Sequence, residues 1–228
     1  MMPKFSFIIP VWNEEAIISR TIEHIRGLHA SGSAEILVVD GDPAGRTIKV
    51  ARHAGVNTAI SETGRGKQMN LGAALAEGEI LIFLHADTIL PSDALNLIEA
   101  AMGETSCIAG AFDLAIDSEK SVFRLIEKAA SIRSRLTRIP YGDQAIFMRK
   151  RNFQDLGGFR EIPIMEDIEI MQRIKRRKGK ICILRKAAST SPRRWEKEGV
   201  LYTTLRNWLI LSLYLFGVKP ESLFRFYR

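Results

Sequence analysis

The most constraining feature of the sequence is an unbroken apolar run at residues 80–84 that ends in a polar cluster containing Asp87. Such a run is typical of a strand buried on both faces, as in a parallel sheet. Ligands of open α/β sheets bind just outside the carboxyl ends of the strands. We therefore expect this strand to hold the Asp87 carboxylate at the mouth of a crevice, where its hard oxygens suit Mg²⁺ or Mn²⁺. The alternative is that Asp87 merely opens the turn before Pro91, because Asp favours such positions.

Strand and helix patterns alternate along the chain before this run. Apolar stretches predict strands at residues 5–11, 35–39 and 57–60, and helical spacing predicts a helix after each of them. Asn13 is expected to cap the first helix. The resulting β-α-β-α-β-α-β order predicts an α/β fold with a mostly parallel, Rossmann-like sheet and helices on both faces.

A long helical pattern runs from Glu119 to Ile139 in the second half of the chain. One of its faces is apolar, and basic residues occupy the other side. That basic side is either an ordinary solvated surface or a surface that meets an anionic acceptor. The apolar positions are Val122, Leu125, Ile126, Ala129, Ile132, Leu136 and Ile139.

The net charge of the 228-residue chain is +7, from 33 Lys and Arg against 26 Asp and Glu. This excess suits an anionic partner, which could be a nucleoside diphosphate, a lipid headgroup or a nucleic acid. The two cysteines, Cys107 and Cys182, lack the spacing of a metal site. Their small number favours a cytoplasmic location and a metal site built without thiolates.

A loop of glycines and cations at residues 64–67 precedes the third predicted helix. Its backbone N–H groups, the helix start and the side chains of Arg65 and Lys67 together suit a phosphate, although a flexible turn is the alternative. Asp40 ends the second strand, where a carboxylate can accept hydrogen bonds from a ribose or a base. An ordinary turn explains Asp40 too, and Glu14 is equally well explained as a charge at a helix start.

Five segments in this order resemble family 2 glycosyltransferases, which have the GT-A fold and use sugar nucleotides. The resemblance covers about residues 5–195. Within the family, the chain is similar to a small bacterial branch. It implies a GT-A-type sheet in one catalytic domain, with a nucleotide-binding half at residues 1–90 and an acceptor half at 91–195. A helical extension then occupies residues 196–228. The five segments are residues 9–15, 38–41, 64–70, 84–87, and 156–159 leading to Glu166 and Asp167.

The resemblance also implies roles for individual residues. A carboxylate, Asp167 or alternatively Glu166, is the general base, and Asp87 binds the Mg²⁺ or Mn²⁺ that bridges the diphosphate. Asp143, Gln144 and Arg194 are expected to face the donor sugar or the acceptor, although a plain turn explains Asp143 almost as well. Arg193 or Arg194 is also expected to reach a phosphate, and a surface pair of arginines is the alternative. The nucleotide-binding residues are expected to be Pro10, Trp12, Glu14, Asp40, Gly64, Arg65, Gln68 and His85.

Two departures from the family pattern limit these expectations. The family's Asp-x-Asp motif reads His85-x-Asp87, and His85 is either a metal ligand or a hydrogen-bond partner of the ribose. Ser191 replaces the Gln of the Gln-x-x-Arg-Trp motif of processive members, so the synthesis of long polymers is not supported.

We therefore expect an inverting transfer of a sugar from a UDP- or GDP-sugar to an unidentified acceptor. A sugar-phosphate nucleotidyltransferase is the alternative enzyme, but it would carry a glycine-rich loop after the first strand, where this chain has residues 12–15. A basic nucleic-acid-binding module is the other rival. Its aromatic and basic strand motifs are missing, and the cations cluster at predicted helix ends, so we expect no nucleic acid partner.

The chain turns strongly apolar after Trp195, and its longest apolar stretch is too short to span a bilayer. An apolar helix flanked by cations is typical of a helix that lies on a membrane surface. We expect this segment to dock on the inner face of the membrane or on a second subunit, or else to pack back on its own domain. The surrounding cations are Arg193, Arg194, Lys197, Arg206, Lys219, Arg225 and Arg228.

Overall fold

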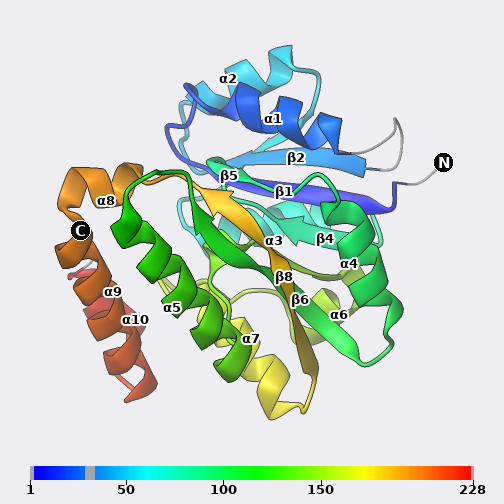
Figure 1. Ribbon diagram of the computed structural model, residues 1–228. Coiled ribbons are helices and arrows are strands. Elements are labelled where there is room, and N and C mark those ends of the chain that lie inside the picture. The colour runs from blue at the N-terminus through cyan, green and yellow to red at the C-terminus, as the bar shows by residue number, and fades with distance from the viewer. Residues whose placement is uncertain (1–2, 29–33, 227–228) are drawn as a thin grey trace.

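An eight-stranded sheet runs through the molecule in the order β3-β2-β1-β4-β7-β6-β8-β5 (Figure 1). The computed structural model describes residues 3–28 and 34–226. Arg228 of the expected cation set lies outside them. The strands are β1 Phe5–Val11, β2 Ala34–Asp40, β3 Asn57–Ile60, β4 Ile80–Phe83, β5 Thr88–Ile89, β6 Cys107–Ile116, β7 Ile146–Arg149 and β8 Lys180–Thr190.

The strands β1 to β4 pair in parallel, which brings the carboxyl ends of β1, β2 and β4 to one edge of the sheet. β6 and β8 are also parallel to each other. β7 runs antiparallel between β4 and β6, and the short β5 runs antiparallel to β8. The α/β prediction with a mostly parallel sheet is confirmed, and the reversed direction of β7 and β5 is the feature that the sequence did not indicate.

Helices cover both faces of the sheet and bury it in two hydrophobic layers. One layer contains buried residues of α1, α2 and α4, and the other contains buried residues of α3, α6 and α7. The run Ile80–Phe83 is buried throughout and contributes to both layers, as expected for a central strand. The helices are α1 Ile18–Gly27, α2 Arg46–His53, α3 Arg65–Leu75, α4 Ala94–Gly103, α5 Ser121–Thr137, α6 Lys150–Leu156, α7 Glu166–Arg176, α8 Arg193–Glu198, α9 Val200–Leu215 and α10 Pro220–Phe224.

The first helix begins later than its predicted cap. Asn13 has a φ of 56°, which lies in the left-handed region, and its side chain accepts a hydrogen bond from Arg46 instead of capping α1. α1 therefore starts at Ile18. The expected N-cap role of Asn13 is wrong, because this polar side chain bonds to Arg46, the first residue of α2, rather than to the backbone of α1.

The apolar face predicted for α5 is not the face that packs on the sheet. Leu125 and Leu136 are 70% and 80% exposed, whereas Phe123, Ser131 and Ser134 are buried. The reason is that the two serines bind polar groups that face the helix: Ser131 accepts a hydrogen bond from the backbone of β6, and Ser134 accepts one from the Gln144 amide. α5 thus exposes much of its apolar surface.

The C-terminal helices form a small hydrophobic cluster of their own with the loop before α7. Ile164, Ile210 and Leu223 are its buried members. Within the described residues, no helix is both long enough and apolar enough to cross a membrane.

The strands β6 and β8 carry Cys107 and Cys182, which form a disulfide with their Cα atoms 6.3 Å apart. The sequence did not predict this pairing.

Candidate functional site

A cleft of about 620 Å³ opens at the carboxyl ends of β1 and β4. It brings together most of the residues that the sequence singled out, although they come from segments far apart in the chain. Asp40 and Gln144 are not among the residues that line it. The singled-out residues that line it are Pro10, Trp12, Glu14, Gly64, Arg65, Gln68, His85, Asp87, Asp143, Glu166, Asp167 and Arg194.

The loop of glycines and cations places the start of α3 at the cleft. Gly64 has a φ of 138°, a conformation that a side chain would strain, and α3 begins at the next residue. A Cβ atom on Gly66 would lie 2.6 Å from the carbonyl oxygen of Arg160, so only glycine permits this close contact. Arg65 lines the cleft, whereas Lys67 pairs with Glu62 and does not line it.

Two polar residues tie the strand ends beneath the cleft. The Gln68 amide donates hydrogen bonds to the carbonyl oxygens of Val11 and Val39, over 2.7 and 2.9 Å, and so joins β1 to β2. Asp40 is completely buried and accepts a hydrogen bond from the backbone N–H of Asp42 over 2.9 Å. Burial raises the pKa of Asp40. In this conformation Asp40 supports the edge of the sheet rather than facing the cleft.

Three charged residues form what we call the paired group: Glu14, Asp87 and Arg193. Arg193, at the start of α8, donates two hydrogen bonds to the carboxylate of Glu14, over 2.8 and 2.5 Å. Its Nε lies 3.2 Å from Oδ2 of Asp87. The hydrogen bonds with Glu14 raise the pKa of Arg193 further. One guanidinium therefore pairs with both carboxylates that follow β1 and β4, and it can balance the charge of only one of them.

His85 lies between two cations and stays neutral. Burial, together with the charges of Arg65 and Arg193, lowers the pKa of His85 to about 3. Its ring packs against Gly142, where an added Cβ atom would lie 3.0 Å from Nε2. A neutral imidazole can accept a hydrogen bond or ligate a metal, but it brings no positive charge to the cleft.

A second set of carboxylates forms what we call the acid group: Asp143, Glu166 and Asp167. Asp167, in the first turn of α7, accepts hydrogen bonds from the backbone N–H groups of Gly142 and Ile168, over 2.7 and 2.8 Å. These bonds fix the direction in which the carboxylate points. They also link the start of α7 to the 3₁₀ turn Gly142–Gln144.

Burial makes the other two members of the acid group poor anions. It raises the pKa of Glu166 to about 7, although the Arg65 guanidinium, 3.5 Å away, offsets part of the effect. Burial also raises the pKa of Asp143 to about 6. Desolvation favours the neutral form of a carboxyl group, so both residues can hold a proton close to neutral pH.

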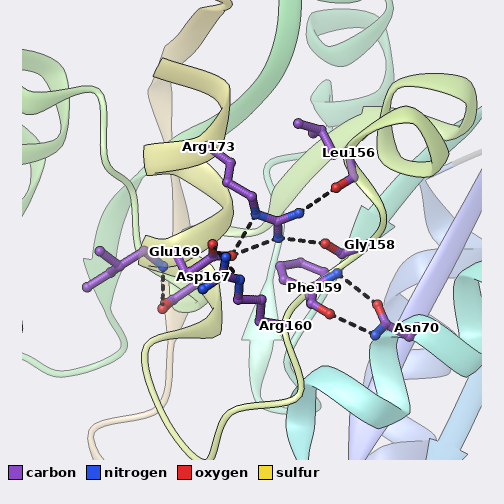
Figure 2. Close-up of polar contacts among 9 residues, drawn as sticks. Asn70, Leu156, Gly158, Phe159, Arg160, Asp167, Glu169 and Arg173 are labelled. Carbon is purple, nitrogen blue, oxygen red and sulfur yellow. Dashed lines mark hydrogen bonds and ion pairs between the residues drawn. The ribbon is translucent and has the colours of Figure 1, made fainter. Parts of the chain in front are cut away.

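The glycine-glycine-phenylalanine motif at residues 157–159 fastens α7, which carries Glu166 and Asp167, to α3 (Figure 2). Asn70 of α3 exchanges two hydrogen bonds of 2.9 Å with the backbone of Phe159. Arg173 of α7 donates to the carbonyl oxygens of Leu156 and Gly158, each over 2.6 Å. Gly158 has a φ of 71°, and a Cβ atom there would lie 2.7 Å from the Asn70 side chain. The loop thus fastens α7 to α3.

Gln144 points away from the cleft and satisfies polar groups inside the protein. Its amide donates to the carbonyl oxygen of Phe112 over 2.7 Å and to Ser134 over 3.1 Å, and it accepts from the backbone N–H of Tyr141 over 3.1 Å. Tyr141 itself lines the cleft, with the Arg133 guanidinium 3.5 Å from the centre of its ring. Tyr141 is a candidate that the sequence analysis missed.

The sequence left open whether Arg193 or Arg194 reaches a phosphate, because the two arginines are adjacent and no sequence rule separates them. Arg194, the residue expected at the site, lines the cleft but lies 3.6 Å from Glu198 of its own helix. The C-terminal extension also contributes to the cleft through Asn207, Ile210 and Phe224. This contribution agrees with the alternative that the C-terminal segment packs back on its own domain.

The residues present fit a divalent cation that arrives with a diphosphate. Among the described residues, no three His, Cys, Asp or Glu side chains are grouped to hold a metal by themselves. Asp87 nevertheless presents one carboxylate to the cleft. Mg²⁺ is commonly bound by one or two carboxylates together with substrate phosphates, which is the arrangement that Asp87 can complete.

Known structures share this fold at low sequence identity. TarS from S. aureus in complex with UDP-GlcNAc is 19% identical, with a TM-score of 0.63, over 82% of this chain and 58% of that chain. Glucosyl-3-phosphoglycerate synthase from Mycobacterium tuberculosis, with Mn²⁺, UDP and phosphoglyceric acid, is 16% identical, with a TM-score of 0.61, over 82% and 70%. A mannosyltransferase from Pyrobaculum calidifontis, with GDP-Man and Mn²⁺, is 17% identical, with a TM-score of 0.61, over 84% and 57%.

The chain spans about three fifths of the length of the TarS structures that comprise residues 1–349 of that protein. No curated protein matches the sequence. The family model described as glycosyl transferase family 2 matches residues 6–159, which is more than half of the chain and includes the ends of β1, β2 and β4. The chain therefore belongs to glycosyltransferase family 2.

Proposed function

We propose that this glycosyltransferase moves a sugar, with inversion, from a nucleoside-diphosphate sugar to an acceptor hydroxyl. The observation that carries the proposal is that one cleft holds both the paired group and the acid group. The paired group offers a guanidinium for a diphosphate and a carboxylate for the metal that accompanies it. The acid group offers carboxylates that can accept a proton. Relatives of the same fold were determined with UDP-GlcNAc and with GDP-Man, which supports a UDP- or GDP-sugar as the donor.

The nucleotide is proposed to lie along the ends of β1 and β4. Trp12 is 47% exposed at the cleft and offers an aromatic surface on which a base can stack. Gly64 and Arg65 offer backbone N–H groups at the start of α3 and a cation for a phosphate. His85, as a neutral hydrogen-bond partner, suits the ribose. The proposed role of Asp40 is indirect, because it lies beneath this edge.

The diphosphate is proposed to lie between Arg65 and the paired group. Arg193 is the cation closest to Asp87, and the negative diphosphate would draw this guanidinium away from the two carboxylates. Asp87 would then hold the Mg²⁺ or Mn²⁺ that accompanies the donor. The metal, when bound, offsets the charge that develops on the leaving nucleotide.

The acid group is proposed to accept the proton of the acceptor. As the acceptor oxygen bonds to the anomeric carbon, the bond from that carbon to the diphosphate oxygen breaks. The hydroxyl proton passes to Asp167, and the electron pair leaves with the nucleoside diphosphate. The two backbone N–H groups that orient Asp167 keep its carboxylate in place. Glu166 is the alternative base, and Asp143 is proposed to contact the donor sugar or the acceptor.

Thermal unfolding with added nucleotides tests the donor site. A nucleoside diphosphate at a hundredfold excess over its Kd stabilises the folded state by about 2.7 kcal/mol, because it binds the folded state alone. We expect UDP or GDP to raise the Tm, and to raise it further with Mn²⁺. Asp87→Ala should remove the metal-dependent part of the shift. A panel of nucleoside diphosphates that leaves the Tm unchanged would contradict the proposal, as would metal dependence that survives in Asp87→Ala.

A further inference from the structure

The outward face of α9 is almost entirely apolar. Its exposed positions recur at helical spacing along the helix. They include Tyr202 and Trp208, whose aromatic rings each carry one polar group. Leu201 is 72% exposed and Phe216 is 89% exposed. We call this set the α9 face. Its residues are Leu201, Tyr202, Leu205, Trp208, Leu209, Leu215 and Phe216.

The helix is attached to the protein by its opposite side. Thr203, Arg206 and Ile210 are the buried residues of α9. Arg206, its one charged side chain, points inward and pairs with Glu198 over 2.5 Å. Asn207 and Ile210 line the cleft. The inner side therefore accounts for the packing of α9 on the domain. Among the described residues, the printed ring contact of the α9 face is with α9 itself, where the Arg206 guanidinium lies 5.2 Å from the centre of the Tyr202 ring.

Exposed cations surround the α9 face at both ends. Lys197 precedes the helix, and Lys219 and Arg225 follow it. None of the three pairs with a carboxylate in the described part of the chain. Glu221 is an exposed acid near them. A long apolar face with aromatic side chains and cations at its ends matches a surface that is apolar inside and anionic at its boundary.

We propose that the α9 face docks on an anionic lipid surface, with the helix lying in the plane of the interface. A second copy of the chain is the less suitable occupant. In a symmetric dimer the same patch meets itself, so the cations at its ends would be brought toward their counterparts. Anionic headgroups instead pair with the cations while the apolar side chains enter the lipid. Because α9 lines the cleft with its other side, docking would bring the cleft within about one helix diameter, ~10 Å, of the membrane.

Sedimentation of the full chain with vesicles tests the proposal. We expect the protein to bind vesicles of phosphatidylglycerol and phosphatidylcholine at low salt, to bind less at high salt, and to bind pure phosphatidylcholine weakly. The double variant Trp208→Gln with Leu209→Gln should lower the partition coefficient at least tenfold, since both side chains are exposed and would enter the lipid. Lys197→Gln with Lys219→Gln should lower binding at low salt and flatten its salt dependence.

Matched variants separate docking from a general loss of apolar surface or charge. Ile60→Gln and Leu75→Gln remove residues that are each 51% exposed, on β3 and α3, and should bind like the wild type. Lys49→Gln removes an exposed cation of α2 and should do the same. An unchanged Tm would show that the double variant is folded. If the wild type does not bind anionic vesicles at low salt, or if Trp208→Gln with Leu209→Gln binds normally, the proposal is wrong. A dimer that this double variant dissociates, without vesicle binding, would make the α9 face an interface between copies.

Discussion

On one side of the cleft, Glu14 and Asp87 share the guanidinium of Arg193. On the other side, burial raises the pKa of Glu166 to about 7 and that of Asp143 to about 6. The two sides use the same residue types within one cleft. What differs is the surrounding: a fixed cation in the paired group, and loss of water in the acid group.

This contrast suggests a division of labour. Carboxylates that pair with an arginine are suited to exchanging that cation for a metal, whereas buried carboxyl groups that titrate near neutral pH are suited to moving protons. Separate environments that push the pKa values of neighbouring acids apart are a common way to assign such roles.

The largest effect is expected from Asp167→Asn. The amide can still accept the hydrogen bond from Gly142 but cannot take a proton, so turnover should fall about 10²–10⁴-fold. Binding of the nucleoside diphosphate should remain unchanged, because the paired group is intact. Release of nucleoside diphosphate by slow hydrolysis of the donor provides an assay without a known acceptor, and calorimetric titration measures binding.

The control for Asp167→Asn is Glu166→Gln in the same assay. If Asp167→Asn turns over at a normal rate while Glu166→Gln does not, the base is Glu166. The rate should then fall as the pH drops below about 7, where burial places the pKa of that residue. Loss of nucleotide binding in Asp167→Asn would break the separation between the two groups.

Arg193→Gln is expected to have the next largest effect, on binding instead of turnover. A hydrogen bond to a charged group contributes about 1.5–3 kcal/mol, so UDP or GDP should bind at least about tenfold more weakly in the presence of EDTA. The effect of Mn²⁺ should increase, because Asp87 loses its competing cation. Titration of nucleotide with EDTA and with Mn²⁺ measures both changes.

Arg124→Gln is the matched control for Arg193→Gln. Arg124 is also a half-exposed arginine in an ion pair, but it lies on α5 and does not line the cleft. It should leave both nucleotide titrations unchanged. If Arg193→Gln binds metal-free nucleotide as well as the wild type, Arg193 is a structural link between α8 and the strand ends, and the paired group has no part in holding the diphosphate.

The order of strands and helices in the first half of the chain could be predicted because each apolar run has one plausible environment. The run ending near Asp87 is buried on both faces, and β3 follows the predicted bounds. In α5 the same reasoning failed. Two serines there are buried because they accept hydrogen bonds from a backbone N–H and a side-chain amide. The pattern of apolar residues does not reveal such partners.

Most candidate site residues could be predicted to gather because parallel strands end at one edge of the sheet. The sequence could not show how their charges are distributed. Arg193 is more than a hundred residues from Asp87 along the chain, and its contact depends on where α8 begins. Likewise, Asp167 and Glu166 are neighbours in sequence, yet their surroundings differ because one faces Gly142 and the other is buried beside Arg65.

The smallest expected effect is a pH-dependent change in stability from Glu166→Gln. Burial raises the pKa of Glu166 to about 7, above the ordinary value of 4.5. The stabilisation that goes with the protonated form is therefore complete below pH 4.5 and is lost as the pH rises through 7. A neutral glutamine avoids the cost of a buried charge, so the variant should gain stability relative to the wild type at pH 8 and little at pH 5. A gain of about 1 kcal/mol raises the Tm by roughly 2–4 °C in a protein of this size.

The control is Glu23→Gln, which changes an exposed acid on α1 and should give the same small difference at both pH values. A lower Tm for Glu166→Gln at pH 8 would mean that the Arg65 pair outweighs burial, and Glu166 would then be a paired carboxylate like Glu14 and Asp87.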